Sequence, residues 1–213
     1  KNIIMEDAIY SSLNYPILTL VTLLPLLGSL LILFIRNEFL IKWVALATTM
    51  GTFIATFPIY KYFDKTTHKM QFMENYQWIP IWNINYKVGI DGISVLFIIL
   101  VAILSILCVT VSWKAIEKNI KGFFVSLLVL ETAMLGIFIS LNAFLFYLFW
   151  ELTLIPMFLL IGVWGGPKRI YSAVKFVLFM VAGSVFMLVG IIILYHVGGK
   201  PFDILELSKV HYP

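Results

Sequence analysis

The chain has 213 residues, of which 62% are hydrophobic and only 12% charged, and its mean hydropathy is +1.00. Soluble domains are about 45–50% apolar and about 25% charged. A water-soluble fold is therefore excluded, and most of the surface is expected to face the lipid bilayer. The net charge of +4 comes from lysines and arginines scattered singly between apolar runs. That pattern excludes a nucleic-acid partner.

Six apolar runs are long enough to cross a bilayer, which takes about 20 residues of helix. Because the connections are short, consecutive helices are expected to be antiparallel neighbours. The sequence thus predicts an all-α, polytopic transmembrane bundle of about six helices, in a single transmembrane region that covers residues 1–213. The predicted helices are 16–35, 40–60, 93–113, 121–141, 143–164 and 172–197.

Residues 61–92 are the longest polar stretch and are expected to be extramembrane or interfacial. Tryptophan, isoleucine and tyrosine alternate around Pro80, which is typical either of an interfacial hairpin or of a helix lying on the membrane surface. The sequence does not choose between these two forms. At the end of the stretch, Asp91 is interpreted as the N-cap of the third helix.

The ends of the chain and its basic residues suggest how it is placed. It begins with Lys1 and ends at Pro213, and we expect it to be a piece of a longer protein. Basic residues are densest in the short loops, which places those loops in the cytoplasm and the N-terminus outside. The residues concerned are Arg36, Lys42, Lys114, Lys118, Lys121, Lys168 and Arg169.

Two glutamates lie inside apolar runs, where a charge costs about 3 kcal/mol or more. Glu131 is ten residues before Leu141 and Glu151 is ten residues after it. At 1.5 Å per residue, both carboxyl groups lie about 15 Å from the turn, near the middle of a hydrocarbon core of about 30 Å. Burial favours the protonated form of each, so the pair is a candidate for proton translocation.

A simpler alternative stays open for both glutamates, namely that each is a protonated side chain that packs helices together. Glu151 is the stronger candidate, because Pro156 frees the carbonyl of Leu152 and loosens the helix beside the acid. Lys175, about one turn inside the sixth helix, has two interpretations. It faces the bundle and exchanges protons with Glu151, or it extends to the cytoplasmic surface.

The sequence contains no motif for a cofactor, a nucleotide or a metal. It has no glycine-rich dinucleotide fingerprint, no P-loop and no pair of cysteines. Its histidines lack metal-ligand spacing. We therefore expect no metal site, no cofactor site and no redox chemistry in this chain, and any ion movement must draw its energy from elsewhere.

Several segments resemble the antiporter-like subunit M family of NADH:quinone oxidoreductase, whose mitochondrial counterpart is NADH dehydrogenase subunit four. The resemblance covers most of residues 16–197. It is most specific in FWELTLIPMFLLIGVWGG and the RIYSAVKF that follows, with further support from PILTLVTLLPLLGSLLILF and VGIDGISVLFIIL.

The resemblance implies the N-terminal portion of a longer bundle, built on two inverted helix repeats that each form half of a proton channel. The essential glutamate of the family's fifth helix maps onto Glu151, and a second glutamate, on the fourth helix, maps onto Glu131. The family's partner lysines lie on helices beyond Pro213. Many relatives have Asp where this chain has Asn142, so any role of an acid at that turn does not carry over.

By the same resemblance, the chain is a translocase subunit of NADH:quinone oxidoreductase that couples quinone reduction in other subunits to proton movement. FMN, iron–sulfur clusters and quinone are then expected in partner subunits, and the partners are other membrane-arm subunits and the lipid bilayer. The location is the bacterial plasma membrane, or the mitochondrial inner membrane if the chain is organellar. The alternatives are a multisubunit cation/proton antiporter, a membrane-bound hydrogenase complex, or a passive scaffold.

Overall fold

The computed structural model describes residues 8–10, 15–82, 84–199 and 202–210. Within them, six helices are long and apolar enough to cross a membrane. The predicted all-α transmembrane bundle is confirmed, and α6 begins three residues before its predicted start. The helices are α1 (Ile17–Phe34), α2 (Glu38–Tyr62), α3 (Gly92–Ala115), α4 (Ile120–Ile139), α5 (Ala143–Trp164) and α6 (Arg169–Val197).

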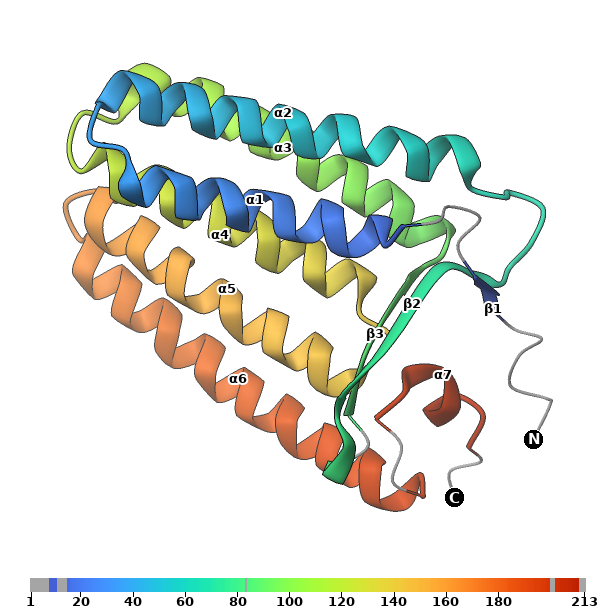
Figure 1. The fold of residues 1–213 in the computed structure, drawn as a ribbon. Coiled ribbons are helices and arrows are strands. Elements are labelled where there is room, and N and C mark those ends of the chain that lie inside the picture. Colours follow the sequence, from blue (N-terminus) through green and yellow to red (C-terminus); the bar gives the residue numbers. More distant parts are fainter. Residues whose placement is uncertain (1–7, 11–14, 83, 200–201, 211–213) are drawn as a thin grey trace.

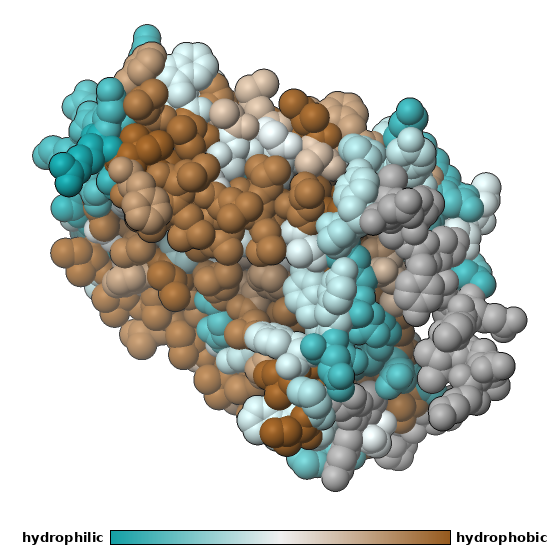
Figure 2. Space-filling view, in the orientation of Figure 1, coloured by the Kyte–Doolittle hydropathy of each residue, from teal (hydrophilic) through white to brown (hydrophobic). Residues whose placement is uncertain are grey.

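Helix α4 is at the centre of the bundle. It packs against α1, α2, α3 and α5, whereas α6 packs along α5 at one edge (Figure 1). Just two of the described α6 residues, Ala173 and Ser184, are buried. On the face that Figure 2 shows, apolar side chains cover the helices as a broad belt, and hydrophilic side chains gather at the two ends. This is the surface of a protein solvated by a bilayer.

Side chains at the loop ends explain where several helices begin. Asn37 accepts a hydrogen bond from the Phe39 amide at the start of α2, and Asp91 accepts one from the Ser94 amide at the start of α3. Asn142 does the same for two amides of α5. Each satisfies amide groups that the first turn of a helix leaves free, and the predicted N-cap role of Asp91 is confirmed.

The predicted extramembrane stretch forms a β-hairpin, not a surface helix. Strands β2 (Met70–Ile79) and β3 (Ile84–Ile90) are antiparallel and are joined through the 3₁₀ turn η1 (Pro80–Trp82). The short strand β1 (Ala8–Tyr10) pairs in parallel with β2. In Figure 1 the hairpin crosses one end of the bundle, which we call the hairpin end.

A bulge turns the start of β2 towards the bundle. The pairing register shifts between Gln71 and Glu74, and Phe72 has a left-handed backbone with φ +53°. All four residues from 71 to 74 are buried, which a regular strand with alternating sides does not permit. The bulge is therefore what brings the Glu74 side chain inward.

The segment after α6 returns to the same end of the bundle. The Ile204 amide donates to the Leu141 carbonyl at 2.9 Å, at the start of the short helix α7 (Ile204–Leu207). The Lys87 ammonium of β3 forms an ion pair with Asp203. The turn between α4 and α5, the hairpin and this segment are thereby tied together.

Candidate functional site

Glu131 is a buried carboxyl group on the central helix α4. Its side chain is 2% exposed, and neither of its oxygens has a hydrogen-bond partner among the described residues. The hydroxyl of Ser105, a buried residue of α3, is near enough to act on this carboxyl group as a hydrogen-bonding neighbour. An ionised carboxylate without donors is strongly disfavoured in apolar surroundings. This arrangement therefore favours a protonated Glu131 and leaves its carboxyl free to form new hydrogen bonds.

Glu151 lies on α5 in a half-buried position, with polar neighbours. Tyr147 is one turn earlier on the same helix, and its hydroxyl interacts both with Glu151 and with Ser184 of α6. Ser184 is 3% exposed, so it faces α5 and not the bilayer. Glu151 thus borders a small polar cluster between α5 and α6.

The two glutamates lie on neighbouring helices that pack closely. A Cβ atom added to Gly136 of α4 would come within 2.4 Å of the Phe149 ring of α5, so the glycine permits this close approach. The helices are antiparallel about a turn of three residues. Since each acid is ten residues from Leu141, both lie about 15 Å from that turn along the helix axes.

Lys175 is on the exposed side of α6. Its ammonium lies 6.0 Å from the centre of the Phe179 ring, and no carboxylate among the described residues forms an ion pair with it. Counted from Arg169, Lys175 is about 9 Å along α6, whereas Glu151 is about 20 Å from the same end of α5. Ser184, about 22 Å along α6, is the residue level with Glu151.

A third buried carboxyl group, Glu74, caps α1 from the hairpin. It accepts hydrogen bonds from the Leu18 amide at 2.8 Å, the Thr19 amide at 3.3 Å and the Thr19 hydroxyl at 2.5 Å. Because that hydroxyl has a single proton, the Tyr86 hydroxyl, 3.0 Å away, donates to Thr19. Burial raises the pKa of Glu74 against the effect of these donors, and burial also raises the pKa of Tyr86.

Several of these neighbours were not predicted from the sequence. Tyr147 is four residues before Glu151, a spacing that places both on one helix face, so that signal was present in the sequence. Ser105 and Ser184 are small polar residues of a kind common between membrane helices. The Glu74 cap has no local signal, because 56 residues separate the acid from Leu18.

Known proteins share both the sequence and the fold. Subunit M of NADH-quinone oxidoreductase from Rhodobacter capsulatus is 40% identical over 206 residues, covering 92% of this chain and 39% of that protein. Chain 4 of NADH-ubiquinone oxidoreductase from Arabidopsis thaliana is 40% identical over 191 residues, covering 88% and 39%. The chain is a homologue of these subunits. The resemblance noted in the sequence is thus confirmed.

Residues 140–212 of this chain match the family model described as "NADH:quinone oxidoreductase/Mrp antiporter, TM". A chain of respiratory complex I from Thermus thermophilus shares its fold, with a TM-score of 0.77 and 24% identity, over 89% of this chain and 38% of that one. This chain is a multi-pass membrane protein. It spans about two fifths of the length of the curated relatives named above. Those relatives are subunits of an enzyme complex.

Proposed function

We propose that this chain provides part of a proton pathway in the membrane arm of an NADH:quinone oxidoreductase, with Glu151 and Glu131 as the proton-carrying groups. The observation that carries the proposal is the buried, unpartnered carboxyl of Glu131, at the same distance from the α4–α5 turn as Glu151. Carboxyl groups inside a membrane are costly and mark ion pathways.

In this mechanism Glu151 changes protonation when charge shifts in a neighbouring subunit. Its half-buried position beside Tyr147 gives it polar contacts through which water can reach it. Glu131, deeper in the bundle, is the second station, with Ser105 as its polar neighbour. Lys175 modulates the charge near α6, and its exposed position suits a partner that covers that helix.

The energy for this movement comes from quinone reduction in other subunits. The sequence has no motif for a redox cofactor, so we assign FMN, the iron–sulfur clusters and quinone to partner subunits. The membrane is then the bacterial plasma membrane, or the mitochondrial inner membrane if the gene is organellar. Other membrane-arm subunits complete the pathway.

The decisive experiment replaces Glu151 with Ala or Gln in the intact complex and measures protons moved per NADH oxidised in sealed vesicles. We expect coupled proton movement to be lost while the complex still assembles. Glu117, an exposed acid in the loop between α3 and α4, supplies the matched control as Glu117→Gln, with normal yield. A normal proton yield in both Glu151 variants would overturn the proposal.

The second candidate is a subunit of a multisubunit cation/proton antiporter, which the description of the matching family model favours. A membrane-bound hydrogenase complex is a related possibility. Proton movement that follows a sodium gradient, without NADH oxidation, identifies the antiporter. A passive scaffold instead requires that Gln at both Glu131 and Glu151 leaves proton yield unchanged.

A further inference from the structure

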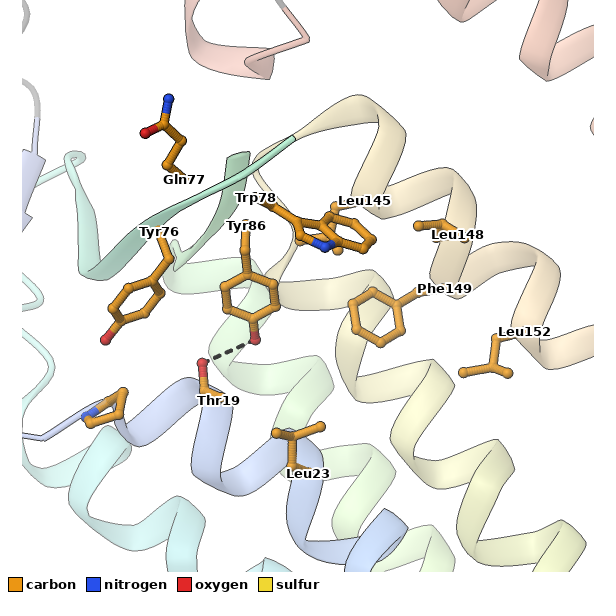
Figure 3. A pocket seen from close by; sticks show the side chains of 11 residues that line it. Thr19, Leu23, Tyr76, Gln77, Trp78, Tyr86, Leu145, Leu148, Phe149 and Leu152 are labelled. Carbon is orange, nitrogen blue, oxygen red and sulfur yellow. Dashed lines mark hydrogen bonds between the residues drawn. The ribbon is translucent and has the colours of Figure 1, made fainter. Parts of the chain in front are cut away.

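A pocket of about 660 Å³ opens at the hairpin end of the bundle, between α1, α5 and the hairpin (Figure 3). Its walls include Thr19 and Leu23 from α1, Tyr76 and Trp78 from β2, and Leu148 from α5. The volume is within the range of about 300–1,000 Å³ that small-molecule sites have. None of the proposed proton-carrying residues lines this pocket.

The pocket is short along the membrane normal. Its lining extends from Pro16 to Leu23 at the start of α1 and from Leu145 to Leu152 on α5, a separation of seven residues in each case. Seven residues of helix correspond to about 10 Å, a third of a hydrocarbon core of about 30 Å. A flexible chain that enters from one side fits a space of this extent.

The pocket is continuous with the surface that faces lipid. Leu27 on α1 and Ile155 on α5, about one turn beyond the lining residues Leu23 and Leu152, are exposed. Because the six helices are apolar enough to cross a membrane, these side chains lie at the depth of the hydrocarbon layer. Acyl chains therefore reach the pocket without leaving the hydrocarbon layer.

The hairpin side of the pocket is polar. The Tyr86 hydroxyl donates to Thr19 and the Thr19 hydroxyl donates to Glu74, a chain that we call the Glu74 network, so neither proton is available to a ligand. The Tyr76 hydroxyl and the Trp78 indole N–H have no hydrogen-bond partner within the described part of the chain, and both side chains are about half exposed. Tyr and Trp of this kind occur where apolar chains meet polar headgroups. Their two donors suit ester carbonyl or phosphate oxygens.

We propose that this pocket binds one membrane glycerophospholipid, with an acyl chain between Leu23 and Leu148 and its ester region at Tyr76 and Trp78. The assignment does not rest on the proton pathway, since none of the proposed proton-carrying residues lines the pocket. Binding would fill the space between α1 and α5 that α4 leaves open.

The test uses a phosphatidylethanolamine with a photoactivatable diazirine in its acyl chain, added to the intact complex in lipid nanodiscs. Cross-linked peptides are mapped by mass spectrometry. Leu23→Trp fills the pocket, and Leu20→Trp is its matched control: the two leucines are 40% and 47% exposed on the same helix, and only Leu23 lines the pocket. Leu148→Phe fills the pocket from α5 if Leu23→Trp does not assemble.

We expect cross-links concentrated on residues 16–23 and 145–152, reduced at least fivefold by a filling variant and unchanged in Leu20→Trp. Equal labelling of these segments and of the exposed face of α3 would show annular lipid and overturn the proposal. Cross-links from this pocket to another subunit, in place of lipid, would overturn it too.

Discussion

Glu74 and Glu131 are both buried carboxyl groups, 6% and 2% exposed, and they differ in every other respect. Glu74, at the hairpin end, accepts three hydrogen bonds and completes the first turn of α1. Glu131, inside α4, accepts none from the described residues. A carboxyl held by donors has a structural role, whereas one without partners is free to gain and lose a proton. Burial alone therefore does not identify a functional acid in this protein.

The largest expected difference between Glu131 and Glu74 is in how much their substitution lowers proton movement. Glu131→Gln removes a titratable group from the proposed pathway, and we expect at least a tenfold lower proton yield per NADH in the intact complex. Glu74→Gln is the matched control, and its yield is expected to be normal because the amide oxygen still accepts from α1. A loss of similar size in both variants would show that Glu131 and Glu74 do not have the different roles assigned to them.

The second difference is in stability. Glu74→Leu leaves the Leu18 and Thr19 amides without their acceptor, and we expect it to lower the free energy of unfolding by about 1–3 kcal/mol. Glu131→Leu removes a buried carboxyl group whose oxygens accept no backbone hydrogen bond among the described residues, and it is expected to be neutral or stabilising. Thermal unfolding midpoints of the two variants in the assembled complex measure this. The reverse order would contradict the structural role of Glu74.

A smaller loss of stability is expected for a substitution of Tyr86, which donates to Thr19 in the Glu74 network. Tyr86→Phe removes the hydroxyl that donates to Thr19 and leaves the Glu74 contacts intact. The expected loss is about 0.5–1.5 kcal/mol. A double-mutant cycle with Thr19→Val separates this hydrogen bond from the packing of the ring. If the two changes are additive, the side chains are not coupled.

The smallest effect is in the pH dependence of stability. Burial raises the pKa of Glu74 above its ordinary value of 4.5, so the folded chain holds this proton more tightly than the unfolded chain. Its contribution to stability is complete below pH 4.5 and is lost as the pH rises through the raised pKa. Relative to Glu74→Gln, the wild type should thus lose stability from pH 4.5 towards neutral. A gain in stability of the wild type over that pH interval would show that folding lowers the pKa of Glu74 instead.

Much of the fold follows from the sequence, because a membrane leaves few choices. Apolar runs such as 93–113 must form helices, since lipid offers no other partner for the backbone. Helices α1, α2 and α5 continue through Pro25, Pro58 and Pro156, as the predicted ranges 16–35, 40–60 and 143–164 require. The position of the two mid-helix glutamates relative to Leu141 follows from helix rise alone.

The tertiary structure decided what depends on contacts between distant segments. Strands β2 and β3 form a hairpin because they pair with each other and pack on the helix ends, which alternation alone does not establish. The cap of α1 by Glu74 joins residues 56 positions apart.

The sequence by itself determined the number of spanning helices, the resemblance to subunit M and the candidate acids, since these depend on local hydropathy and residue order. The structure decided which carboxyl groups have donors, and that Lys175 is on the exposed side of α6 while Ser184 faces α5. Side-chain direction depends on how each helix rotates against its neighbours. Packing of the whole bundle sets that rotation.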